Sequence, residues 1–442
     1  MVGQPSAAFK GQGLSVRDGR GKSVPVSGSF TAQARGGSIL IKGKAYTSPV
    51  TVRSKQPIVC DSRAYEGEFR LSAQSGRLTV VNSLDVEKYL RGVLGFEVNP
   101  KWPLEVLKAQ AVISRTFALQ QLGRHGKAGF DVCPTDHCQV YRGVAVHSPR
   151  TDQAIAQTRG QVLTYGGKLA YAYFCSDSGG ATADVRHVWG GSVPYLVVRR
   201  EPYPSESPRS NWQAVIPAAE IQRALAKKGM SVGSLKSVSI VQRDQAGRAV
   251  QLKFTGSAGS AVMNSAAFRT LIGSRKIQST FFEFSPIAGM PAASASPKTT
   301  YAPAARGEKI AYDTTPLTPE QDAQLESLIK QRKFSAADRV DMLMYPERRM
   351  HYLKKALGQL EGGSAVPPQR QPSAGKPFPP SPAAAGNATA DLRGGALHLY
   401  GRGWGHGIGL SQWGAKAMAE HGWSAQKILQ FYYPGTAIEK RK

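Results

Sequence analysis

One glutamate, Glu97, has a sequence context that suits acid–base chemistry. It lies between a segment of helical spacing at 85–95 and a second one that begins at Pro103, and its neighbours are Phe96 and Val98. Apolar neighbours partly exclude water, which raises the pKa of a carboxyl group towards neutrality. Such a group can donate a proton and later accept one. The alternatives are a solvated loop carboxylate or a cap for the following helix.

Two other glutamates and one arginine lie near this position in the sequence. Glu87 and Glu105 fit exposed helix positions, so we expect them to take no part in chemistry. Arg115 follows several apolar residues, where a charge is costly unless it faces a carboxylate or a substrate. We expect it to contact substrate or Glu97, and a structural ion pair at the helix edge is the alternative.

A cysteine- and histidine-containing segment offers metal ligands. Cys133, His137 and Cys138 form a C-x3-H-C cluster, which is one ligand short of a closed tetrahedral site. A disulfide between the two cysteines, or two reduced thiols, are the alternatives to zinc. Cys60 and Cys175 show no pattern, so we expect buried free thiols.

The segment at 401–436 is rich in glycine. Five glycines alternate between residues 401 and 409, a pattern that ordinary strands and helices tolerate poorly. We therefore expect another group to approach this backbone closely.

The elements that must position these residues indicate an α+β fold. Alternating segments bounded by Gly, Ser or Pro predict strands between 37 and 86, and again at 161–175, 237–244 and 249–256. Helical spacing predicts a long helix from residue 103 to residue 122 that packs on a sheet. Its apolar face would comprise Leu104, Leu107, Ala111, Ala118 and Leu122.

Composition predicts four regions along the chain. Residues 1–36 form a flexible lead, and 37–287 form the first part of the main domain. Residues 288–390 form a low-complexity, largely disordered insertion with a helical subdomain at 318–361, and 391–442 complete the main domain. Within the insertion we expect three helices. The first begins with a capping box at Thr318 and Gln321, the second begins near Ser335, and the third carries Met350 and Leu353.

Charge limits the classes of partner. The chain has 57 Lys and Arg against 30 Asp and Glu, a net charge of +27 that would attract polyanions. The basic residues are scattered and accompany no nucleic-acid-binding motif, so we expect no nucleic acid partner. No apolar run is long enough to span a membrane, and residues 1–10 lack the apolar core of a secretory signal.

Four blocks, in order along the chain, resemble a known family. Residues 86–119, 131–143, 171–191 and 401–436 resemble the signature blocks of the sporulation stage II protein D and LytB family. The resemblance covers roughly 37–286 and 391–439. It implies a two-lobed α+β protein with a central cleft that acts on peptidoglycan outside the cytoplasm, which would require a leader that this chain does not show. Sporulation members are lytic transglycosylases that cut glycan strands stripped of stem peptides.

The resemblance also implies a set of site residues. The catalytic glutamate falls on Glu97, glycines would let a sugar press on the backbone, and Trp404 and Trp413 would offer flat faces. Ala183 stands where an acidic residue is common in the family. Some members hold zinc through the 131–143 block and others do not. The expected substrate-binding residues are Arg115, Tyr173, Ser176, Ser178, Thr182, His406, Ser411 and Gln412.

Two functions of different classes follow from the resemblance. A lytic transglycosylase uses the primary hydroxyl of muramic acid as nucleophile, so a single carboxyl group serves as acid and then as base. No cofactor is required for that reaction, and zinc would be structural. A LytB-type protein would instead bind the wall and enhance a partner amidase. The expected partners are therefore glycan strands and a cell-wall amidase or another wall hydrolase.

Overall fold

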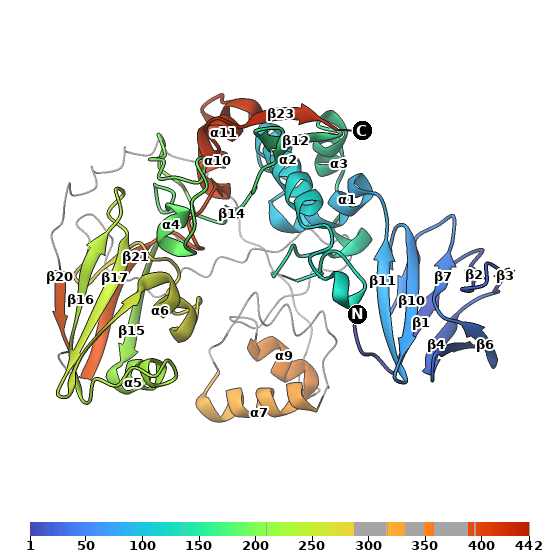
Figure 1. Ribbon diagram of the computed structural model, residues 1–442, viewed down its shortest axis with the longest axis horizontal. Coiled ribbons are helices and arrows are strands. Elements are labelled where there is room, and N and C mark those ends of the chain that lie inside the picture. The colour runs from blue at the N-terminus through green and yellow to red at the C-terminus, as the bar shows by residue number, and fades with distance from the viewer. Residues whose placement is uncertain are drawn as a thin grey trace. The chain divides into compact units, whose positions relative to one another are not determined.

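The computed structural model describes residues 1–135, 137–208, 210–286, 315, 317–331, 349–357, 388–392 and 395–441 (Figure 1). The chain divides into two compact units. One combines Met1–Pro303 with Gly375–Lys442, and the other is Ala304–Ala374. Helices and several mostly antiparallel sheets confirm the predicted α+β class. No helix among the described residues has the length and apolar character needed to cross a membrane.

Residues 1–83 form two sheets around a shared apolar core. The six-stranded sheet has the order β6-β5-β4-β1-β8-β9, and the five-stranded sheet has the order β11-β10-β7-β2-β3. Their strands are β1 (Ser6–Lys10), β2 (Ser15–Arg17), β3 (Ser23–Pro25), β4 (Phe30–Arg35), β5 (Ser38–Ile41), β6 (Lys44–Thr47), β7 (Val50–Arg53), β8 (Ile58–Cys60), β9 (Arg63–Tyr65), β10 (Glu68–Gln74) and β11 (Arg77–Ser83).

The prediction of a flexible lead at 1–36 is wrong. Ala7 and Phe9 of β1 are buried, Ala8 and Lys10 are exposed, and β1 pairs with β4 and β8. This is the alternation of a half-buried strand. Glycines and charged residues interrupt these short strands, so the pattern is visible only once the partner strands are known.

A helical core surrounds α2 (Leu104–Gln120). This helix contacts α1 (Val86–Glu97), α3 (Pro149–Gln157), α10 (Gln412–Glu420) and α11 (Ala425–Tyr432), as well as strand β12 (Gln161–Tyr165) (Figure 1). Every residue from 109 to 118 is buried. The expectation that α2 packs on a sheet through a single apolar face is therefore wrong. The helix ends before Leu122, whose side chain is 61% exposed. Strands β13 (Lys168–Leu169) and β23 (Ala437–Lys440) flank β12. Two 3-10 helices, η1 (Gly126–Ala128) and η2 (Gly143–Val146), follow α2 in the chain, and η2 contacts α1.

The remaining sheets join residues from both sides of the insertion. One has the order β15-β21-β19 and the other β18-β17-β16-β20, so the chain after residue 388 completes sheets begun before residue 286. Helices α5 (Ala218–Ala226) and α6 (Ser265–Ile272) pack on them, and α4 (Val185–Val188) contacts α6. The strands are β15 (Asn211–Pro217), β16 (Leu235–Arg243), β17 (Ala249–Gly256), β18 (Gly259–Asn264), β19 (Phe282–Glu283), β20 (Ala388–Asp391) and β21 (Ala396–Arg402). A parallel pair, β14 (Phe174–Cys175) with β22 (Leu410–Ser411), lies outside these sheets.

Two of the helices predicted within the insertion are present. Helix α7 (Pro319–Lys330) begins with the predicted capping box, in which Gln321 N donates to Thr318 Oγ1 and Thr318 N donates to Gln321 Oε1. Helix α9 (Arg349–Ala356) carries Met350 and Leu353, both buried. The helix predicted near Ser335 and the low-complexity tracts lie outside the described residues.

A buried ion pair connects α1 to α2. The Arg115 guanidinium contacts both carboxylate oxygens of Glu87, at 2.9 and 2.7 Å, and also donates to the carbonyl of Gln161 at 3.0 Å. The Arg115 side chain is 0% exposed and that of Glu87 is 12% exposed. The structure therefore places Arg115 with Glu87 rather than with Glu97 or solvent, and Glu87 is buried rather than exposed.

This ion pair generates a prediction about stability. Arg115→Met should lower the free energy of unfolding by about 3–5 kcal/mol, because it leaves the Glu87 carboxylate buried without its partner. The double variant Arg115→Met with Glu87→Leu should recover much of that loss. Urea unfolding of both variants measures this, and a single variant within about 0.5 kcal/mol of wild type would contradict a structural role.

Candidate active site

Glu97 is the last residue of α1, a helix whose two ends are both defined by the local sequence. Asp85 caps its first turn by accepting from Glu87 N and Lys88 N, and Val98 adopts an extended conformation that ends it. The Glu97 side chain is half-buried, and one carboxylate oxygen accepts from Val140 N at 3.4 Å. Its backbone carbonyl accepts from Gln412 Nε2 at 3.0 Å. Segments far apart in sequence therefore meet at this residue.

Burial dominates the electrostatics of Glu97. Desolvation raises the pKa of its carboxyl group to about 7, and the Val140 N–H and the charge of Arg142 oppose that rise. Arg142 also stacks on the ring of Phe96 at 4.7 Å. No carboxylate among the described residues, a set that omits Asp136, contributes to the shift. The predicted cause, dehydration by apolar surroundings, therefore agrees with the structure.

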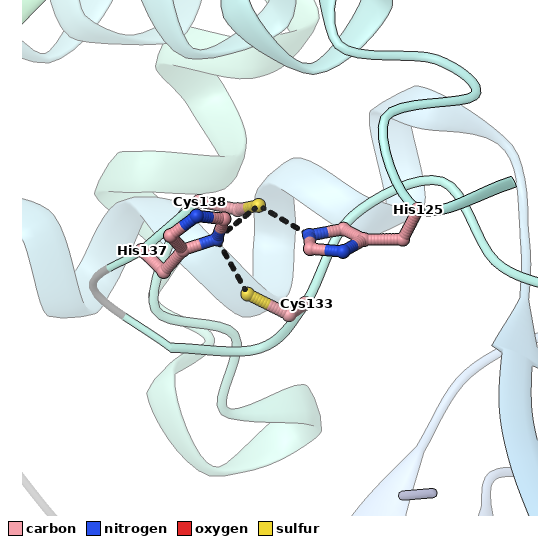
Figure 2. Close-up of side chains that lie close together, drawn as sticks. All are labelled: His125, Cys133, His137 and Cys138. Carbon is pink, nitrogen blue, oxygen red and sulfur yellow. Dashed lines mark hydrogen bonds between the residues drawn. The ribbon is translucent and has the colours of Figure 1, made fainter. Parts of the chain in front are cut away.

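Four side chains that can bind a metal ion lie close together in the segment that follows α2 (Figure 2). His125, Cys133, His137 and Cys138 place their ligand atoms within 4.8 Å of one another. His125 Nε2 lies 3.4 Å from Cys138 Sγ, and His137 Nδ1 lies 3.6 Å from Cys133 Sγ and 3.5 Å from Cys138 Sγ. All four cysteines of the chain, including the buried Cys60 and Cys175, are free thiols.

These distances fit a tetrahedral zinc site. Zinc bonds of about 2.0–2.3 Å at tetrahedral angles separate nitrogen and sulfur ligands by roughly 3.5 Å. Two thiolates and two imidazoles are also a common donor set for structural zinc. His125 would be the fourth ligand, which the motif Cys133, His137 and Cys138 lacks. The wider spacing H-x7-C-x3-H-C contains it, but the seven-residue gap gave no local signal.

The loop that carries this cluster also contacts Glu97. Val140, the donor to the Glu97 carboxylate, lies two residues after Cys138. Between them, Gln139 is buried and accepts from the hydroxyl of Tyr89 on α1 at 3.2 Å. An ion bound by the cluster would fix the position of this loop, and with it the hydrogen bond to Glu97.

The glycine block is approached by protein backbone. Segment 173–180 runs against it: Asp177 N donates to Trp404 O at 3.0 Å, and Trp404 N donates to Asp177 O at 2.8 Å. Gly405 has a φ of +124°, and a Cβ there would lie 2.7 Å from Cys175 Cβ. At Gly409, with a φ of +71°, a Cβ would collide with the carbonyl oxygen of Tyr173. The expected close approach is present, but its partner at these positions is the chain itself.

Several predicted substrate-binding residues are buried at the contact between segment 173–180 and the glycine block, which we call the junction. Ser411 caps α10 by accepting from Gly414 N and also accepts from Ser178 N. Ser178 Oγ donates to Glu201, and Thr182 Oγ1 donates to the carbonyl of Val197. Ser178, Thr182 and Ser411 are each at most 1% exposed. Their observed contacts are structural.

A second cluster of charged groups contains the half-buried Glu201 and the buried Arg248, and the sequence did not predict it. Burial raises the pKa of Glu201 to about 7, and Glu201 accepts from the hydroxyls of Ser178 and Tyr432. Arg248 is 1% exposed and donates to the carbonyls of Ser178 and Ala181. These residues come from segments with no shared motif, so only the folded chain reveals the cluster.

The remaining predicted residues lie closer to solvent. Gln412 is 7% exposed and bonds to the Glu97 carbonyl, whereas Tyr173, Ser176 and His406 are half-buried. Burial and the charge of Arg269 lower the pKa of His406 to about 4, and its Nδ1 accepts from Ile408 N. Neutral imidazole is therefore its form at neutral pH. Trp404 and Trp413 are half-buried, and Trp413 packs against Trp102 at 4.9 Å.

A known protein family covers the segment that contains the candidate site, and several known proteins have similar sequences. Residues 74–165, which include Glu97 and the four-ligand cluster, match the family described as Stage II sporulation protein. An uncharacterised protein of Brachyspira hyodysenteriae is 30% identical over 240 residues, 54% of this chain and 63% of that protein. The Amidase enhancer of Bacillus subtilis is 27% identical over 353 residues, 79% of this chain and 40% of the relative.

A third relative carries the family's own name. Stage II sporulation protein D of Bacillus subtilis is 28% identical over 200 residues, which are 40% of this chain and 58% of that protein. The chain thus spans less than two thirds of the length of each of these relatives. The match covers the helix that presents Glu97 and the loop that contacts it. Residues 74–165 of the chain therefore carry a domain of the stage II sporulation protein family, and the chain is similar to proteins named Stage II sporulation protein D and Amidase enhancer.

Proposed function

We propose that this protein is a peptidoglycan lytic transglycosylase in which Glu97 is the general acid and base. The observation that carries the proposal is the half-buried Glu97 carboxyl group, whose pKa is raised to about 7. A hydrolase needs a second carboxylate to activate water or to attack the sugar. A lytic transglycosylase needs only one, because the substrate supplies the nucleophile.

In the proposed reaction, protonated Glu97 donates its proton to the glycosidic oxygen as the bond to the anomeric carbon breaks. Positive charge develops on the sugar ring, and the Glu97 carboxylate then accepts the proton of the muramic acid primary hydroxyl. That oxygen bonds to the anomeric carbon and closes the anhydro ring. The proton given up in the first step is regained in the second, so the enzyme returns to its starting state.

The chain positions Glu97 for this reaction from two sides. Val140 N–H donates to the carboxylate, and Gln412 Nε2 donates to the backbone carbonyl of Glu97. Zinc bound by His125, Cys133, His137 and Cys138 would supply structural rigidity to the loop that carries Val140. No step of the reaction requires the metal.

A binding role is the second candidate, and one relative favours it. The relative that aligns over 79% of this chain is named Amidase enhancer. A protein of that kind would bind peptidoglycan together with an amidase and would not cut glycan itself. Either function places the protein outside the cytoplasm, at the cell wall, with glycan strands as its partner.

Digestion of glycan strands distinguishes the two candidates. Strands stripped of stem peptides should yield anhydro-muramic ends with wild type, and Glu97→Gln should lower the rate at least about 100-fold, because proton transfer contributes about 10²–10⁴-fold. Mass spectrometry of the products measures this, with the exposed Glu439→Gln as matched control. Equal product from both forms would exclude Glu97, and product from neither would favour the enhancer.

Stability against pH tests the raised pKa without any substrate. The folded state holds the Glu97 proton up to about pH 7, while the unfolded chain releases it near 4.5, so its contribution to stability is lost as pH rises between these values. Glu97→Gln should match wild type below pH 4 and exceed its free energy of unfolding by about 1–3 kcal/mol above pH 8. Urea unfolding measures this, and a constant difference across pH would contradict the assignment.

Metal content tests the fourth ligand. Zinc-loaded protein should hold one ion per chain, and His125→Ala should weaken zinc affinity at least about tenfold, because three ligands leave the tetrahedron open. Removing zinc with a chelator should lower the thermal midpoint of wild type by more than that of the variant, because the variant binds the ion more weakly. The exposed His398→Ala provides the control. An unchanged zinc affinity in His125→Ala would remove this histidine from the site.

A further inference from the structure

A row of aromatic rings crosses the surface beside the glycine block. Tyr171 and Tyr173 stack with centroids 6.0 Å apart, Tyr173 meets Trp189 at 4.8 Å, and Trp189 meets His406 at 4.8 Å. Trp189 is 51% exposed and Tyr171 is 43% exposed. Large aromatic side chains are usually buried, so two exposed rings held by neighbouring rings form an unusual apolar surface.

The backbone fixes this row in place. Tyr171 N donates to the hydroxyl of Tyr195 at 2.8 Å, and Trp189 N closes the turn of α4 on the carbonyl of Val185. Asn264, which caps α6, donates its amide to the carbonyl of His187 at 2.7 Å. A hydrogen bond therefore connects α6 to α4 next to Trp189. The ring that a ligand would contact is thus already positioned before the ligand binds.

Helix α6 also brings a cation to this place. Arg269 lies close enough to His406 to lower the pKa of its imidazole, and burial lowers the pKa of Arg269 itself to about 10. Its Nε is buried without a hydrogen-bond partner, and within the described part of the chain no carboxylate pairs with its guanidinium. A half-buried guanidinium without a counter-ion is a candidate anion site, because Arg donors suit a planar carboxylate.

We propose that Trp189 and Tyr171 stack on a hexosamine ring and that Arg269 binds the free lactyl carboxylate of muramic acid. This inference rests on the proposed glycan substrate and adds the reason for its selectivity. The lactyl carboxylate is an anion only when the stem peptide has been removed, because in intact strands it forms an amide bond with the peptide. Arg269 is thus the residue that distinguishes stripped strands from intact ones, and the rings bind both.

Binding measured in the uncut state tests this assignment. All proteins carry Glu97→Gln, and three ligands of equal length are compared: stripped strands, strands with stem peptides, and chitin oligosaccharides, which lack the lactyl group. Arg269→Gln should weaken binding of stripped strands about tenfold, as for one lost charge-assisted hydrogen bond, and leave the other two unchanged. Arg269→Lys should retain part of the selectivity. Trp189→Ala should weaken binding of all three ligands at least about tenfold.

The controls separate this inference from the proposed function. Val215→Ala removes an equally exposed apolar side chain from β15 and should change nothing. Thermal unfolding of each variant identifies loss of binding through loss of fold. Equal effects of Arg269→Gln on all three ligands, or none, would overturn the carboxylate assignment, and intact binding by Trp189→Ala would overturn the stacking role. Selective binding by a protein that makes no anhydro ends would refute only the catalytic proposal.

Discussion

The arrangement at Glu97 depends on one constraint: a carboxyl group is partly removed from water without an ionic partner among the described residues. The resulting free-energy cost favours the protonated form up to about pH 7. Arg142 and Val140 N–H moderate this cost but do not neutralise it. A carboxyl group paired with arginine would stay ionised and could not act as an acid at neutral pH. On the same helix, Glu87 differs from Glu97 in that its carboxylate is paired with Arg115.

Holding such a group requires support from distant segments. The carboxylate meets the loop of the four-ligand cluster, and the carbonyl of the same residue meets Gln412. Gln412 in turn begins α10, which Ser411 caps and which packs on α2. At Gly405 a side chain would clash with Cys175, and at Gly409 it would clash with the carbonyl of Tyr173, so glycine is needed where this block approaches segment 173–180.

The two glutamates whose pKa is raised to about 7, Glu97 and Glu201, differ in their surroundings. Glu97 is half-buried with one backbone donor, whereas Glu201 accepts from two hydroxyls beneath the junction and lies near Arg248. Equal pKa values therefore do not indicate equal roles. Both side chains are half-buried. They differ in their partners, because the hydroxyls of Ser178 and Tyr432 bond to Glu201, whereas the Glu97 carboxylate accepts only from a backbone N–H among the described residues.

The sequence by itself determined the features that depend on neighbours along the chain. These are the helical segment at 85–95 that precedes Glu97, the capping box of α7, the strands at 37–86 and 249–256, and the dehydrating neighbours of Glu97, all of which follow from local periodicity and side-chain chemistry. The helix extends two residues further than predicted and includes Glu97 itself. Only the tertiary structure decided which distant groups meet. It paired Arg115 with Glu87, brought His125 to the cysteines, turned Ser178 and Ser411 inward, and revealed strands in residues 1–36. These contacts join residues that are distant in sequence, and they depend on which segments pack against each other. The residue pattern within one segment does not specify its packing partner.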